Sequence, residues 1–276
     1  MHWRSGGFNF HAWHHQFRVA WIFWEDHENS TIFRSSHKIG DEMVTQVNEY
    51  AQPIGESLPG WTPRPGPERI VLEGTYCRLE PLDAACHAEN LYGAYSVATD
   101  SRDWTYMAAG QFVHLGDYRR YAEGAAQSKD PAHYAVIDRK TGKAVGTLAL
   151  MRIDTANGAI EVGNVMFSPQ LKRTPISTEA QFLLMSYVFD VLGYRRYEWK
   201  CDSLNAPSRQ AAARLGFRFE GIFRQAVVYK GRSRDTAWYS MVDSEWPERK
   251  RAFQAWLAAD NFDEQGAQRK PLERFE

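Results

Sequence analysis

Apolar and polar positions alternate with two different periods along the chain, and the change of period separates predicted strands from predicted helices. Alternation predicts a strand at residues 76–82, and segments bounded by turns predict further strands at residues 133–138, 144–153, 159–167, 194–201, 218–228 and 235–242. Apolar residues three and four apart predict helices at residues 84–95, 117–125, 174–192, 205–215 and 246–261. Glycine-containing turns at 139–143 and 157–158 join three consecutive strands, which predicts antiparallel hairpins.

The stretch of residues 161–217 reads as strand, basic turn, helix, strand and helix. Thr174 suits the N-cap of the first helix, because its hydroxyl can accept a hydrogen bond from an unpaired backbone N–H, and Pro175 suits the first helical position. Lys172 and Arg173 add two positive charges at the positive end of this helix. We therefore predict a site for a phosphate-bearing cofactor on this turn. The alternative is a capped helix with a solvated basic turn.

The second helix of the stretch opens at Asn205 with an early proline and closes at Gly216, which suits a C′ position. Short sequence pieces recur around it in a fixed order. They are Thr178-Glu179-Ala180, Leu192-Gly193-Tyr194, Asn205 with Ser208, Leu215-Gly216-Phe217 with Glu220-Gly221, and Arg234-Asp235. Together, over residues 72–242, they resemble the GNAT superfamily of acetyl-CoA-dependent N-acetyltransferases, in particular the branch that acetylates ribosomal-protein N-termini.

The resemblance implies an α+β fold with a GNAT-like mixed, mostly antiparallel sheet flanked by helices. It also implies acetyl-CoA as co-substrate, an amine acceptor as partner, and no metal. The implied cofactor-binding residues are Val165, Met166 and Phe167 along a strand, Lys172, Arg173, Thr174, Ile176 and Ser177 on the turn, and Asn205 and Ser208. Ser208 is the implied proton donor to the leaving thiolate. Trp104 and Tyr106, in a loop of the acceptor wall, are candidates for acceptor contact; the alternative is that they anchor that loop.

The chain departs from the family pattern at three places. Pro175 replaces a glycine of the pyrophosphate loop, which removes one backbone donor. Ala212 stands where many members have a tyrosine, and Ala226-Val227 stands where the ribosomal-protein branch can carry a glutamate. Glu161, on the central strand, is therefore our candidate for the general base.

The missing glutamate bears on the acceptor. A lysine amine with a pKa of about 10.4 is only about 0.04% neutral at pH 7, whereas an α-amine with a pKa of about 7.7–8.0 is roughly 10–15% neutral. Without a strong base, the rate of transfer to an α-amine falls far less than the rate of transfer to a lysine side chain. We therefore expect acetyl transfer to a protein N-terminus or a small amine. The departures also leave two alternatives open: a non-catalytic acyl-CoA-binding or regulatory protein, and an interaction domain that has lost cofactor binding.

Composition narrows the class of protein further. The chain has 276 residues, 43% hydrophobic and 24% charged, with a net charge of −1, which is ordinary for a globular protein and argues against a nucleic-acid partner. Three well-separated cysteines, Cys77, Cys86 and Cys201, indicate neither a disulfide framework nor a zinc site. We expect a cytoplasmic protein without a membrane partner, as a monomer or homodimer.

The domain organisation follows from local composition. Residues 1–42 hold six of the nine histidines; we expect an N-terminal extension that is disordered or not native, with Met43 as the working start and a metal site on His11, His14 and His15 disfavoured. Prolines and glycines predict an extended arm at 43–69, which Trp61 could pin to the body. We expect the acetyltransferase domain at 70–244 and a C-terminal helix and tail at 245–276.

Overall fold

The computed structural model describes residues 46–264 and 266–275. The predicted extension at residues 1–42, with its three clustered histidines, lies outside these residues. The chain divides into two compact units between Leu58 and Pro59. The described part of the first unit holds one small antiparallel hairpin, in which β1 (Gln46–Val47) pairs with β2 (Pro53–Ile54).

The second unit is built on an eight-stranded sheet with the order β3-β4-β5-β6-β7-β8-β10-β9. Its strands are β3 (Leu72–Glu73), β4 (Cys77–Pro81), β5 (Ala132–Asp138), β6 (Ala144–Asp154), β7 (Ala159–Phe167), β8 (Arg196–Asp202), β9 (Arg218–Tyr229) and β10 (Arg232–Val242). Every neighbouring pair is antiparallel except β7 and β8, which run parallel because a helix connects them. The predicted mixed, mostly antiparallel sheet is therefore confirmed.

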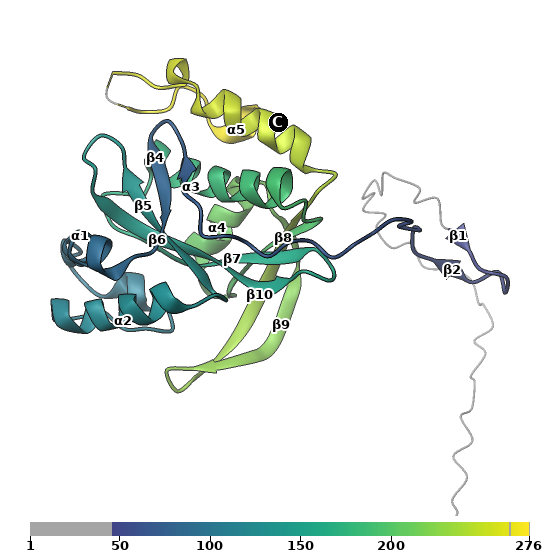
Figure 1. Cartoon of the computed structure of the whole chain (residues 1–276), viewed down its shortest axis with the longest axis horizontal. Helices are drawn as coiled ribbons and strands as arrows, with labels where there is room; N and C mark the ends of the chain where they lie inside the picture. Colours follow the sequence, from purple (N-terminus) through teal and green to yellow (C-terminus); the bar gives the residue numbers. More distant parts are fainter. Residues whose placement is uncertain (1–45, 265, 276) are drawn as a thin grey trace, which may run out of the picture. The chain divides into compact units, whose positions relative to one another are not determined.

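Five α-helices flank the sheet in the described part of the chain. They are α1 (Ala84–Ser96), α2 (Leu115–Gln127), α3 (Pro175–Ser186), α4 (Ala206–Arg214) and α5 (Trp246–Leu257). Helices α3 and α5 lie on one side of the sheet, and α1 and α2 lie on the other (Figure 1). Two apolar cores result, because each face of the sheet is buried against its own helices.

Three predicted helix boundaries were wrong. The helix expected at 174–192 ends as α3 at Ser186, and a π-turn follows at Tyr187–Val191, where the N–H of Leu192 bonds to the carbonyl of Tyr187, five residues back. The expected closing helix stops at Leu257, before a separate 3-10 turn. Helix α2 begins at Leu115, two residues earlier than the pattern indicated.

Two long-range anchors fix the edges of the second unit. The buried carboxylate of Glu179, on α3, accepts hydrogen bonds of 2.7 Å from the backbone N–H groups of Thr75, Tyr76 and Cys77, and so holds the turn between β3 and β4. The Trp61 indole donates to the carbonyl of Ala156 at 2.9 Å. Within the second unit, Trp61 therefore attaches residues 59–69 of the predicted arm to the sheet. Within the described ranges, no helix is long and apolar enough to cross a membrane.

Candidate active site

The site begins where strands β7 and β8 part. Their parallel pairing ends at Val162 opposite Trp199, although both strands continue beyond that point. A bulge in β7 follows at once: the register against β6 shifts between residues 163 and 166, and Asn164 has a φ of 49°. A bulge bends its strand and leaves backbone groups without ladder partners. Met166 and Phe167 are therefore paired with β6 on one side, and residues 165–167 lack a strand partner on the other.

The turn after β7 is held by its own hydrogen bonds. The carbonyl of Ser168 accepts from the backbone N–H groups of Leu171 and Lys172, and Arg173 has a left-handed φ of 60°. None of the described residues accepts a hydrogen bond from the backbone N–H of Arg173, Thr174 or Ile176. These donors lie at the positive end of α3, which is the arrangement that binds phosphate at helix N-termini.

One detail of this turn differs from the sequence prediction. Thr174 is the N-cap residue and Pro175 is the first helical residue, as expected, but the Thr174 hydroxyl caps no backbone N–H. It donates instead to the carbonyl of Leu171 at 2.7 Å. The hydroxyl thus closes the turn, and the helix-terminal amides keep their free hydrogen-bonding capacity.

Helix α4 places Ser208 beside the gap on the same face of the sheet as α3. The Asn205 side chain caps α4 by accepting from the Ser208 backbone N–H at 3.2 Å. The Ser208 hydroxyl accepts from the indole N–H of Trp199 at 3.0 Å. Burial raises the pKa of the neighbouring Cys201 thiol, to which Ser208 also hydrogen-bonds. The serine hydroxyl is therefore held in place by two residues of strand β8, Trp199 and Cys201.

Glu161 lies on the opposite face of the sheet. Side chains alternate across a strand, and Ile160 and Val162 belong to the core under α3, so Glu161 points the other way. Its side chain is only 3% exposed and is contacted by Arg152 at 2.6 Å and Lys200 at 3.1 Å. Burial raises the pKa of the Glu161 carboxyl, while Arg152 and Lys200 oppose that rise. The predicted base and the predicted proton donor thus lie on opposite faces of the sheet at the gap between β7 and β8.

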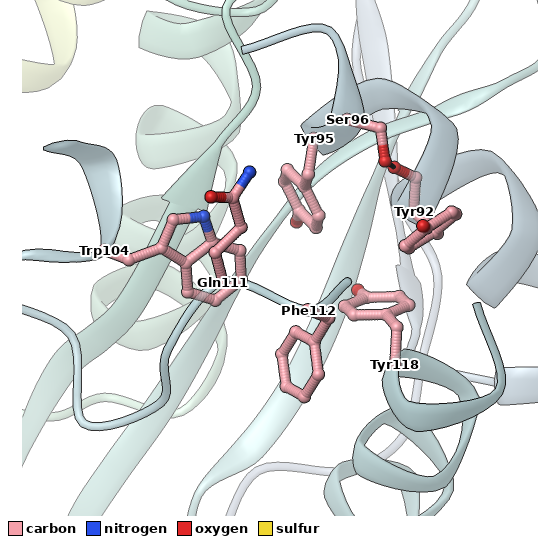
Figure 2. Close-up of a pocket in the computed structure, with 7 residues that line it drawn as sticks. All are labelled: Tyr92, Tyr95, Ser96, Trp104, Gln111, Phe112 and Tyr118. Atoms are coloured by element: carbon pink, nitrogen blue, oxygen red, sulfur yellow. Dashed lines mark hydrogen bonds between the residues drawn. The ribbon is translucent and has the colours of Figure 1, made fainter. Parts of the chain in front are cut away.

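The loop between α1 and α2 carries the two candidate acceptor contacts. Trp104 is 5% exposed, and its ring meets Tyr95 and Phe112 edge-on. Figure 2 shows Tyr95 between Trp104 and Tyr118. The cavity among these rings measures about 10 Å³, which is room for roughly one water molecule. Trp104 therefore anchors its loop in this structure, and its contact with an acceptor stays a prediction.

The same loop is tied to three elements around the gap. The Tyr106 hydroxyl donates to the carbonyl of Leu204, just before α4, at 3.1 Å. Lys230 and Arg232, at the tip of the β9–β10 hairpin, donate to the carbonyls of Trp104 and Thr105. The carboxylate of Asp103 lies 2.5 Å from the ammonium group of Lys172. The loop thus connects the predicted acceptor wall with the predicted phosphate site.

Four residues near the gap were not predicted from sequence: Lys200, Arg152, Asp103 and Tyr95. The Tyr95 hydroxyl donates to the carbonyl of Met166 at 3.1 Å, so one backbone acceptor on the predicted acyl-chain strand is already engaged. The sequence signal for Lys200 was its alternation with Glu198 along β8. This spacing places both side chains on the face of the sheet away from the α3 core. Among the residues described, no cluster of side chains is suited to a metal ion.

Comparison with known proteins identifies the family to which this chain belongs. The family model described as "Acetyltransferase (GNAT) domain" matches residues 77–218, and the chain belongs to this family. A solved GCN5-related N-acetyltransferase from Brucella melitensis is 54% identical, with a TM-score of 0.78, over 79% of this chain and 99% of that one.

Two curated relatives match over shorter stretches. The uncharacterized N-acetyltransferase p20 of Bacillus licheniformis is 29% identical over 41% of this chain and 63% of its own length. YdaF of Bacillus subtilis strain 168, described as a candidate ribosomal N-acetyltransferase, is 29% identical over 38% of this chain and 57% of its own length. The predicted resemblance to the ribosomal-protein branch is thereby confirmed.

Proposed function

We propose that this protein is an acetyl-CoA-dependent N-acetyltransferase that transfers the acetyl group directly to a primary amine, either a protein N-terminus or a small amine. The observation that carries the proposal is the gap between β7 and β8, with free helix-terminal amides on one face and a buried carboxylate on the other. The diphosphate of the cofactor would lie on the turn at residues 172–177, and the acyl chain along residues 165–167.

The reaction needs two proton movements on opposite sides of the thioester. The amine nitrogen attacks the thioester carbonyl carbon, the new C–N bond forms, and the C–S bond breaks. The amine loses a proton to Glu161 on the face of the sheet opposite α3, and the departing thiolate takes a proton from Ser208 on the α3 face. Glu161 then releases its proton to solvent and Ser208 takes one up, which restores both side chains. Because acceptor and cofactor approach from different faces, no covalent enzyme intermediate is needed.

The acceptor class follows from the charges around Glu161. Burial raises the pKa of this carboxyl, but Arg152 and Lys200 both favour its ionised form and so limit its strength as a base. A weak base serves an α-amine better than a lysine side chain, because a larger fraction of the α-amine is neutral at pH 7. The similarity to YdaF, described as a candidate ribosomal N-acetyltransferase, supports the same class.

The test combines calorimetric titration of acetyl-CoA with thiol release from acetyl-CoA in the presence of an amine panel. The panel pairs peptides that differ only in whether the free amine is an α-amine or a lysine side chain. We expect micromolar binding and faster thiol release with the α-amine peptides. Binding without thiol release would favour the non-catalytic acyl-CoA-binding alternative, and indifference to acetyl-CoA would favour an interaction domain.

A further inference from the structure

Lys200 lies beside the proposed base Glu161 but has no role in the reaction as proposed above. It is the first residue of β8 beyond the last pair with β7, so it lies at the point where the two strands part. Its side chain is only 8% exposed. The ammonium group lies 3.1 Å from Glu161 Oε2, 2.7 Å from Glu198 Oε2, and 3.7 Å from the centre of the Trp238 ring.

The arrangement around Lys200 is nearly symmetric. Glu161 and Glu198 stand directly opposite each other in the parallel register, where two like charges repel. Each carboxylate has its Oε1 atom on an arginine, Arg152 for Glu161 and Arg196 for Glu198, and its Oε2 atom on Lys200. Among the residues that the structure describes, Lys200 is therefore the one cation that both carboxylates share. A buried carboxylate pair without it would be pushed towards protonation.

The contact between Lys200 and Glu161 leaves a proton-accepting site on the carboxylate, because each carboxylate oxygen carries two lone pairs. Glu161 Oε2 is buried and accepts no hydrogen bond within the described part of the chain, although Lys200 lies 3.1 Å away. A lone pair on this oxygen therefore remains free for a proton. The charged groups facing Glu161 are Arg152 from β6 and Lys200 and Glu198 from β8.

We infer that Lys200 is a positioning residue for the acetyl transfer: by bridging Glu161 and Glu198 at the strand gap, it keeps Glu161 ionised and directs its free oxygen towards the acceptor amine. This inference rests on the proposed function. Trp238 completes the arrangement, because the face of its ring lies against the ammonium group and Phe223 stacks on it at 4.3 Å. The aromatic pair excludes water from one side of Lys200 and so strengthens its pull on the two carboxylates.

The experiment is the pH dependence of kcat/KM for one α-amine peptide, measured with the full chain as wild type, Lys200→Met and Lys200→Arg. Log kcat/KM rises by one per pH unit where only the acceptor amine titrates, and by two where Glu161 titrates as well. The pH at which the slope changes from two to one is the break, and it reports the pKa of Glu161. Loss of a cation within about 4–6 Å raises the pKa of a carboxyl by about one unit or more. In Lys200→Met we therefore expect the break to move up by about one pH unit and activity below it to fall about tenfold.

The controls separate this role from a structural one. Lys200→Arg keeps the charge, so its break should return towards the wild-type pH. Lys250→Met removes a lysine that pairs with Asp190 on the far helical layer, and its break should not move. If Lys200→Met does not fold, Arg152→Gln provides the second test, because Arg152 is 54% exposed and its loss should move the break in the same direction.

The outcomes distinguish this inference from the proposed function. An active wild type whose break stays fixed in Lys200→Met and Arg152→Gln would overturn the role of Lys200 while leaving the acetyltransferase proposal intact. A wild type that neither binds acetyl-CoA nor releases thiol would overturn the proposed function itself. Calorimetric affinity for acetyl-CoA should stay within about threefold of wild type in all variants, since Lys200 lies on the face opposite the cofactor turn.

Discussion

The ammonium group of Lys172 lies 2.5 Å from the carboxylate of Asp103, and the two residues belong to different parts of the proposed site. Lys172 precedes α3 on the turn proposed for the cofactor phosphates, while Asp103 lies on the loop that also carries Trp104 and Tyr106. In this ion pair the Lys172 ammonium group already contacts a carboxylate, and the cofactor phosphates would need the same ammonium group. Cofactor binding and the conformation of the acceptor loop are therefore expected to be linked.

Removing the carboxylate should strengthen cofactor binding. Asp103→Asn frees Lys172 without changing the size of the side chain, and an exposed ion pair is worth about 0.2–1 kcal/mol. We expect acetyl-CoA to bind about 1.5- to 5-fold more tightly in a calorimetric titration. Asp100→Asn is the matched control, because Asp100 pairs with Arg102 in the same loop and has no contact with Lys172. Equal affinity in wild type and Asp103→Asn would show that the ion pair does not compete with the cofactor.

Removing the turn cations should weaken cofactor binding in a salt-dependent way. Lys172→Ala and Arg173→Ala each delete a charge proposed to face phosphate, and we expect about tenfold weaker acetyl-CoA binding, or about 1.4 kcal/mol, at low salt. The difference from wild type should shrink as sodium chloride is raised towards 1 M, because salt screens exposed charges. Lys140→Ala, on the exposed turn between β5 and β6, should leave the affinity unchanged. A loss that is insensitive to salt would contradict a phosphate contact.

The proton donor is tested by removing one hydroxyl. Positioned proton transfer contributes about 10²–10⁴-fold to a rate, so Ser208→Ala should lower kcat by at least about 100-fold. Affinity for acetyl-CoA should change little. Ser208→Thr keeps a hydroxyl at the same place and should recover most of the rate. A kcat for Ser208→Ala within about threefold of wild type would remove Ser208 from the proton pathway.

The Glu179 carboxylate should be a major determinant of stability. Glu179→Ala leaves three backbone N–H groups at residues 75–77 without their acceptor. The Cys77 donor is buried and the other two are partly buried. An unsatisfied buried donor costs about 1–3 kcal/mol, so we expect the free energy of unfolding to fall by at least about 1 kcal/mol in urea titrations. Glu123→Ala, on the exposed face of α2, should change it by less than about 0.5 kcal/mol. Similar values for the two variants would mean that this turn is held by other contacts.

The three cysteines should differ sharply in reactivity. Cys86 is exposed, whereas Cys77 and Cys201 are buried and burial raises the pKa of both thiols. Because the thiolate is the reactive form, a disulfide reagent at pH 8 should modify one thiol per native chain quickly and all three after denaturation. In Cys86→Ser the fast phase should disappear. Two fast thiols in the native protein would contradict the burial of either Cys77 or Cys201.

The order of elements and much of the proposed cofactor side could be predicted from the sequence, because those features are local. Thr174, Pro175, Asn205 and the glycine turns act through backbone geometry within a few residues of themselves. The polar, glycine-containing turns at 139–143 and 157–158 likewise separate β5, β6 and β7, whose central residues are mostly buried. The end of α3 at Ser186 was not predicted, because the apolar spacing continues through the π-turn at Tyr187–Val191 that follows it.

The charge contacts on the face of the sheet opposite α3 depend on the tertiary structure and could not be predicted from local sequence. Lys200 lies 39 positions after Glu161 in the sequence, and nothing local indicates that the parallel register of β7 and β8 places Glu161 opposite Glu198 with Lys200 next to both. The ion pair between Asp103 and Lys172 likewise joins two loops that only the packing of α1 and α3 on opposite sides of one sheet brings together. Local sequence determines which segments are strands and helices, because backbone propensity and burial act over a few residues. Charge contacts between distant segments depend on strand register, which is set only when the whole sheet is assembled.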